Sequence, residues 1–280
     1  MNDRVTVDIQ DGVADVRLVR ADKMNALDTA MFAALVETGE RLKTERGVRA
    51  VVLSGEGRAF CAGLDTSNFG QMASGERRGG QGGTAGALLT PKRTPGGANH
   101  AQQACMVWRE IPVPVIAAVH GVAYGGGFQL ALGPDMRFVT PDVKLSVFEI
   151  RWGLVPDMAG IFLMRDLLRD DVARELTFSG RIFSGEEALQ MGLATRVCAD
   201  PRAEALAFAR EVAGRNPHAI RAAKRLLNLA QRADQQEILL EESREQSALI
   251  GSPNQVEAVM ANLQKREPSF ADVEDAKVDA

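Results

Sequence analysis

Cysteine and aromatic residues are scarce in this chain of 280 residues, and their scarcity narrows what the protein can be. Its three cysteines are an odd number at wide spacing and form no Cys-x-x-Cys pair, which supports neither a disulfide framework nor a structural zinc site. The three histidines are equally scattered, at His100, His120 and His218. No metal site is therefore predicted.

The sequence also lacks a long hydrophobic run and a surplus of positive charge. The longest apolar run covers residues 115–119, far short of the ~20 residues that cross a bilayer, and the first residues are polar rather than signal-like. Lys and Arg number 33 against 37 Asp and Glu, a net charge of −4. That balance argues against nucleic acid as a primary partner. We expect a cytoplasmic protein that binds neither nucleic acid nor membrane.

The hydrophobic pattern predicts an α/β fold for the first two thirds of the chain. Alternating apolar residues on both sides of Asp11-Gly12 predict a β-hairpin. Asp28 is placed to cap a helix, after which apolar residues 50–53 predict a buried strand. Further short strand patterns follow at residues 115–119, 137–139 and 145–147.

The last third has the pattern of a helical region. Helices are predicted over residues 201–214, 217–233, 235–250 and 252–265. Each carries an apolar face beside a charged one, so each needs a partner surface in this chain or in another copy. We divide the chain into a core at residues 1–200 that holds the site and a helical region at residues 201–280.

Glycine is concentrated in residues 70–97, mixed with Ser, Thr, Arg and Pro. This composition predicts a long mobile loop and is typical of disorder. Its position between a strand and the next helix leaves a second interpretation open, a lid over a site.

Two segments have the character of a ligand site. In residues 121–130, three glycines separate an apolar strand from an apolar helix, whose first N–H groups are unpaired and favour an anion or oxyanion. The spacing is neither the dinucleotide fingerprint nor the P-loop. In residues 51–65 an apolar strand runs into Phe60-Cys61-Ala62-Gly63-Leu64-Asp65.

Together the two segments resemble the enoyl-CoA hydratase/isomerase (crotonase) superfamily, which carries F-x-A-G-x-D after a strand and G-x-x-x-G-G-G before a buried helix. The resemblance extends from residues 20–27 to residues 263–270. It implies the crotonase-like fold, a superhelix of repeated β-β-α units with a helical C-terminal region. It also implies trimers through residues 201–280, commonly paired into hexamers as a dimer of trimers.

The resemblance implies an acyl-CoA thioester as substrate and a reaction through an enolate. The peptide N–H groups of Leu64 and Gly126 would then face the thioester oxygen as an oxyanion hole, whereas Gly126 could alternatively serve only close packing. Residues beside these donors would bind the substrate, namely Ala62, Gly63 and Asp65. Coenzyme A is part of the substrate, so no separate cofactor is expected. Lys265 matches a basic position near the coenzyme's phosphates, or is simply a lysine at a solvated helix end.

The acid/base positions distinguish the members of the superfamily. Hydratases carry two glutamates, of which the first is replaced here by Gln129 and the second is Glu149. An amide cannot take up a proton, so Gln129 is left as a substrate-binding residue and simple hydration lacks one partner. Asp157 follows Glu149 at the spacing found in the dienoyl-CoA isomerases, although it could also cap the next helix.

Three functions remain open from the sequence. Double-bond isomerisation of an enoyl- or dienoyl-CoA by Glu149 and Asp157 is the leading hypothesis. Hydration of an enoyl-CoA is the alternative, with the two carboxylates holding a water. A relative that binds acyl-CoA without catalysis is the third. The superfamily's aryl-CoA dehalogenases also place an aspartate at position 157, but they carry a tryptophan where this chain has Glu149, which disfavours them.

Overall fold

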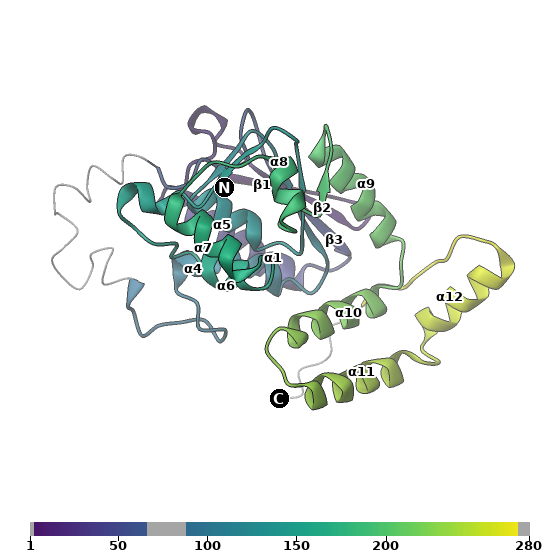
Figure 1. The fold of residues 1–280 in the computed structure, drawn as a ribbon. Helices are drawn as coiled ribbons and strands as arrows, with labels where there is room; N and C mark the ends of the chain where they lie inside the picture. Colours follow the sequence, from purple (N-terminus) through teal and green to yellow (C-terminus); the bar gives the residue numbers. More distant parts are fainter. Residues whose placement is uncertain (1–2, 66–87, 274–280) are drawn as a thin grey trace.

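The computed structural model describes residues 3–65 and 88–273 of the chain. A six-stranded sheet lies at the centre of its core (Figure 1). The strand order is β1-β2-β3-β4-β6-β8, with β1 antiparallel to β2 and the remaining pairs parallel. The strands are β1 (Val5–Gln10), β2 (Val13–Leu18), β3 (Ala50–Gly55), β4 (Val115–Val119), β6 (Met136–Val139) and β8 (Arg196–Val197).

The predicted hairpin is confirmed in β1 and β2. Asp11 and Gly12, the two turn residues, have φ angles of 50° and 78°. Positive φ at both central residues suits the right-handed twist of the two strands, and aspartate and glycine adopt it most readily. The buried strand predicted after Asp28 is confirmed as β3.

Helices cover both faces of the sheet. On one face lie α1 (Thr29–Thr44), α4 (His100–Glu110) and α5 (Gly126–Leu132), while α9 (Pro201–Ala213) packs on the other with Ala205, Ala209 and Ala213. Asp28 caps α1 as predicted, accepting a hydrogen bond from the N–H of Met31. The helical faces and the sheet together bury a continuous apolar core, which fixes the position of α5.

A second, smaller sheet explains how the chain alternates between layers. Its strands are β5 (Val122–Tyr124) and β7 (Lys144–Ser146), which run parallel. Single bridges from Cys61 to Ala123 and from Leu145 to Phe183 extend it. From β3 onward, successive units therefore place one strand in the large sheet and the next segment in the small one before a helix follows. This arrangement confirms the expected repetition of β-β-α units.

Short elements follow the second sheet and lead to the last third of the chain. They are η2 (Glu149–Trp152), α6 (Gly160–Arg165), α7 (Asp170–Ser179) and α8 (Gly185–Gln190), and η1 (Ala21–Lys23) precedes α1. The strand β8 has only two residues and was not apparent in the sequence.

The last three helices extend away from the sheet as a C-terminal arm, defined as α10 (Pro217–Ala230), α11 (Gln235–Leu249) and α12 (Pro253–Gln264) (Figure 1). These bounds confirm the helices predicted there. The buried ammonium of Lys224 anchors the arm to the core by bonding Asp135 Oδ2 at 2.7 Å and Val113 O at 2.8 Å. Among the described residues, no helix has the length and apolar character to cross a membrane.

Candidate active site

The Leu64 turn is held so that one of its peptide N–H groups points outward. Leu27 N donates to Gly63 O at 2.8 Å, and Asp65 N donates to Leu27 O at 3.1 Å. In a parallel bridge of this kind, the flanking residues 63 and 65 make the hydrogen bonds. The N–H of Leu64 therefore faces away from Leu27.

The second turn lies directly against the first. Gly126 is the first residue of α5, so its N–H has no partner within the helix. A Cβ atom added to Gly63 would lie 3.6 Å from Gly126 N and only 2.5 Å from Tyr124 O, and Gly63 has a φ of 89°. Only glycine fits there, and its absence of a side chain brings the two turns together.

The two carboxylate oxygens of Glu149 differ in their hydrogen bonding. Its Oε1 accepts a hydrogen bond of 2.6 Å from Gln129 Nε2. Within the described residues, its buried Oε2 has no hydrogen-bond partner. Burial raises the pKa of the Glu149 carboxyl, and the nearby charge of Asp157 adds to the increase. A half-buried carboxylate with a raised pKa and one oxygen without a partner among the described residues is typical of a general acid or base.

Gln129 is buried, and both ends of its side-chain amide bond to the protein. Its side chain is 1% exposed. Its Oε1 accepts hydrogen bonds from the N–H groups of Met158 and Gly160, each at 2.8 Å. The amide thus connects Glu149 to the turn that precedes α6.

Asp157 lies in that turn, and the expectation that it caps the next helix is wrong. The N-cap of α6 is Ala159, with a φ of 68°, and no side chain caps the helix. Asp157 is exposed at the surface, yet partial burial of its carboxyl by neighbouring residues raises its pKa. It is therefore available for chemistry beside Glu149.

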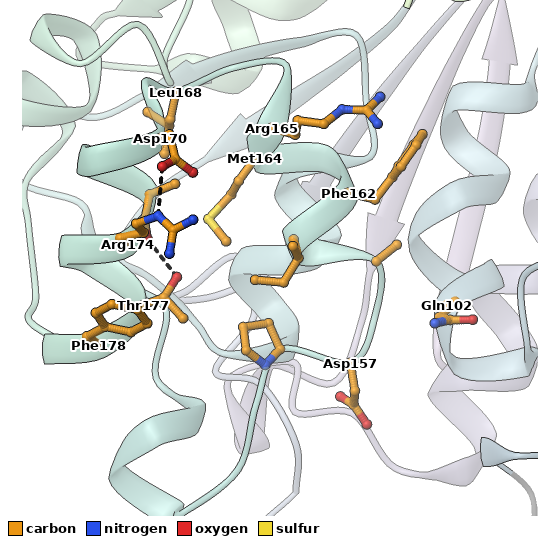
Figure 2. A pocket seen from close by; sticks show the side chains of 14 residues that line it. Gln102, Asp157, Phe162, Met164, Arg165, Leu168, Asp170, Arg174, Thr177 and Phe178 are labelled. Atoms are coloured by element: carbon orange, nitrogen blue, oxygen red, sulfur yellow. Dashed lines mark hydrogen bonds and ion pairs between the residues drawn. The ribbon is translucent and has the colours of Figure 1, made fainter. Parts of the chain in front are cut away.

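A cavity of about 660 Å³ opens next to Asp157, between α6, α7 and the end of α4 (Figure 2). Figure 2 shows Asp157 at one edge and Gln102 at another, while Arg174 is turned toward Asp170, with which it pairs. Most of the wall is apolar, formed by Pro156, Ala159, Ile161, Phe162, Met164, Leu168, Ala173 and Phe178.

Asp65 supports the first turn through an ion pair. Its Oδ2 lies 2.7 Å from Arg20 Nη1, which also donates to Ala26 O at 2.9 Å. Arg20 was not predicted as a site residue, although it opens the segment that carries the resemblance. Through Arg20 the pairing links Asp65 to the backbone at Ala26.

The buried Asn25, which was also not predicted as a site residue, bonds to the segment that leads into the same turn. Asn25 has a φ of 55°, and its Nδ2 donates to Glu56 O and Ala59 O. Ala62 N donates to Met24 O at 2.9 Å, which attaches the turn to the same loop. Asparagine tolerates the left-handed region better than most residues, and that property was the available signal.

Lys265 does not join the other site residues within one chain. It is the exposed C-cap of α12, with a φ of 52°, and Figure 1 shows α12 far from α5. Of the glycine-rich segment, residues 70–87 lie outside the described residues. Within the described residues, no three His, Cys, Asp or Glu side chains gather in a way that could hold a metal ion.

Comparison with known proteins identifies the family. The family described as Enoyl-CoA hydratase/isomerase matches residues 8–273. A probable enoyl-CoA hydratase of Bacillus subtilis is 30% identical over 250 residues, which cover 88% of this chain and 90% of that protein. The mitochondrial Delta(3,5)-Delta(2,4)-dienoyl-CoA isomerase of Mus musculus is 31% identical over 267 residues, 92% of this chain and 78% of that protein. The crystal structure of an enoyl-CoA hydratase from Bacillus anthracis superposes with a TM-score of 0.84 at 26% identity, covering 95% of this chain and 98% of that one. The chain therefore belongs to the enoyl-CoA hydratase/isomerase (crotonase) family, has its fold, and is an enzyme of this superfamily, whose members act on acyl-CoA thioesters.

Proposed function

We propose that the enzyme moves a carbon–carbon double bond of an enoyl- or dienoyl-CoA. The observation that supports this best is the buried Oε2 of Glu149, which has no hydrogen-bond partner among the described residues and lies near the carboxylate of Asp157. Isomerisation needs one proton removed from one carbon and one proton added to another. Glu149 and Asp157 supply one carboxyl group for each transfer, and burial raises the pKa of both.

In this proposal the peptide N–H groups of Leu64 and Gly126 bind the thioester oxygen. Removing a proton from the acyl chain leaves an enolate, whose negative charge lies on that oxygen. Two preorganised donors stabilise this charge more than the neutral substrate, each by ~3 to 4 kcal/mol. One of the two carboxyl groups, Glu149 or Asp157, takes the proton from one carbon of the acyl chain, and the other donates a proton to a second carbon. The acyl chain lies toward the apolar cavity beside Asp157. The step consumes no water, and coenzyme A enters only as part of the substrate, so we propose no separate cofactor.

Hydration remains the second candidate because Glu149 Oε2 is also suited to hold a water molecule. Gln129 cannot exchange a proton, so Asp157 would have to be the second acid or base. The two candidates give different products from the same substrate.

Turnover of a panel of enoyl- and dienoyl-CoA thioesters in deuterated water separates them. Mass spectrometry would show solvent deuterium without added water for an isomerase, and the mass of one added water for a hydratase. Addition of water as the main reaction would reject the isomerase proposal. Thioester binding without either product would identify a non-catalytic relative.

We also propose that the enzyme forms trimers, alone or as a dimer of trimers, through the C-terminal arm. Helix α11 buries none of its residues within the chain, and Leu227 and Leu239 on the arm are 69% and 53% exposed. Lys265 would then approach the coenzyme of a neighbouring copy. Leu227→Asp is expected to lower the oligomer mass in analytical ultracentrifugation, whereas Leu89→Asp, at an exposed position outside the arm, is the matched control. A monomeric wild type would refute the proposal.

A further inference from the structure

The Gln129 side chain connects the two parts of the site that carry carboxylates. Its Nε2 donates to Glu149 Oε1, and its Oε1 accepts from Met158 N and Gly160 N. The amide cannot be turned round, because an NH₂ group in place of Oε1 would face two N–H donors. Both ends of Gln129 are therefore fixed by the fold.

The backbone around this amide is shaped to accommodate it. A Cβ atom on Gly160 would lie 2.6 Å from Gln129 Oε1, and one on Gly125 would lie 3.2 Å from Glu149 Oε1. Between the two N–H donors, Ala159 has a φ of 68°, a conformation uncommon for residues other than glycine. The N–H groups on the two sides of Ala159 are directed at one oxygen and form a nest, which favours an oxygen acceptor at this point.

We propose that Gln129 is a positioning residue that holds Glu149 by Oε1, so that Oε2 alone exchanges protons, and that fixes the turn carrying Asp157 relative to it. This inference deepens the proposed function and rests on Glu149 acting as an acid or base. Gln129 itself touches no reacting atom. Its effect is to keep two carboxyl groups, from separate elements, in one arrangement.

The charges around Glu149 decide what a change at position 129 would do. Among the described residues, Asp157 is the neighbour whose charge raises the pKa of Glu149, while Arg151 of η2 donates a hydrogen bond to Gly180 O. Cys105 also faces the pair, but burial raises the pKa of its thiol well above its ordinary value and keeps it neutral. A neutral amide that donates to Glu149 therefore favours its ionised form.

Two variants separate positioning from simple packing. Gln129→Met removes the donor and is expected to raise the pKa of Glu149 by about one unit, the usual size for losing one charge-assisted hydrogen bond. Gln129→Glu keeps the shape and the acceptor for the nest but places a second carboxylate beside Glu149, so the increase is expected to be larger. Carbon-13 NMR titration of labelled glutamate, assigned with Glu149→Gln, measures both without turnover.

Kinetics supply the second measurement. Misplacing Oε2 should lower kcat by about 10- to 100-fold in Gln129→Met while KM changes by less than about threefold, as expected for a geometric error at a reacting group. The matched control is Gln103→Met, which removes another buried amide that donates to carboxylates, those of Glu40 and Glu110. It should leave the Glu149 titration and kcat unchanged.

The outcomes are distinct. A Glu149 titration that stays within about 0.3 unit of wild type in both folded Gln129 variants would overturn the inference, since one unit corresponds to a sizeable interaction. Equal shifts in Gln103→Met and Gln129→Met would also overturn it, because they would reflect general loosening. A wild type that converts no thioester would refute the proposed function, and the titrations would still decide the role of Gln129.

Discussion

Strands β3 and β4 in the core are buried along almost their whole length, whereas α11 in the C-terminal arm buries none of its residues. The two regions are therefore stabilised differently. The core depends on apolar contacts that its own sequence supplies, because each face of the sheet is covered by helices of the same chain. The arm depends on helix caps, ion pairs and a few anchoring contacts. All the candidate site residues except Lys265 lie in the first region.

The largest effect is expected from a change in the core that removes one backbone donor. Gly126→Pro deletes the N–H proposed to face the thioester oxygen and should lower kcat by at least ~10³-fold. The added carbon would also press on Met158 and Leu27, so Gly126→Ala, which adds the same Cβ but keeps the N–H, is the control. Stopped-flow turnover of both variants measures the difference. Equal activity in the two would remove Gly126 from the oxyanion site.

A second core variant tests the acid/base group. Glu149→Gln keeps the shape of the side chain but cannot exchange a proton, so kcat should fall by at least ~100-fold while thioester binding persists. Turnover and equilibrium binding of an acyl-CoA measure the two effects. The arm should be unaffected, and an unchanged sedimentation profile would show this. A decrease of less than tenfold would contradict the role given to Glu149.

The arm is expected to respond in stability rather than in chemistry. Lys224→Met breaks the ion pair with Asp135 and should lower the free energy of unfolding by about 2–3 kcal/mol. This loss is smaller than for a fully buried pair, because the Asp135 side chain is partly exposed. Arg225→Met, on the same helix, breaks an exposed pair with Glu245 and should cost at most ~1 kcal/mol. Denaturant unfolding measures both values.

Hydrogen exchange sharpens the same comparison. In Lys224→Met, amides of the arm should exchange faster while those of α5 stay protected. Faster exchange in α5 as well would mean that core and arm unfold as one unit.

The smallest expected effect is a pH dependence of stability at Glu149. Burial raises its pKa in the folded protein, so the folded state holds the proton more tightly than the unfolded chain, whose pKa is about 4.3. The resulting stabilisation is present below the unfolded pKa and is lost as the pH rises through the folded pKa. Glu149→Gln should therefore gain Tm relative to wild type as the pH rises from about 4 toward neutral, because the variant lacks the group whose stabilisation is lost. A relative loss over that range would contradict the assigned direction.

Features that depend on neighbouring residues were predictable from the sequence. The Asp11-Gly12 turn, the Asp28 cap and the helices of the arm follow from local rules, and the structure confirms them. The two short glycine segments sufficed to indicate the family. The two-residue strand β8 was missed because so short a segment has no periodicity.

Contacts between distant segments were not predictable. Asp157 precedes a helix and looks like its cap, but the turn is shaped instead around Gln129, whose bonds reach Met158 and Gly160. The bond from Gln129 to Glu149 likewise joins α5 to η2. No local pattern contains these pairings, so the sequence showed only that Gln129 replaces a carboxylate.

The two donors proposed for the oxyanion site belong to the main chain, and this has a consequence for how the enzyme can evolve. Replacing Leu64 by any residue other than proline leaves its peptide N–H in place. The means of polarising the thioester is thus separated from the identity of the side chain beside it. Substitutions at this position can reshape the surroundings of the substrate while the donor persists, so selectivity can change without the chemistry being rebuilt.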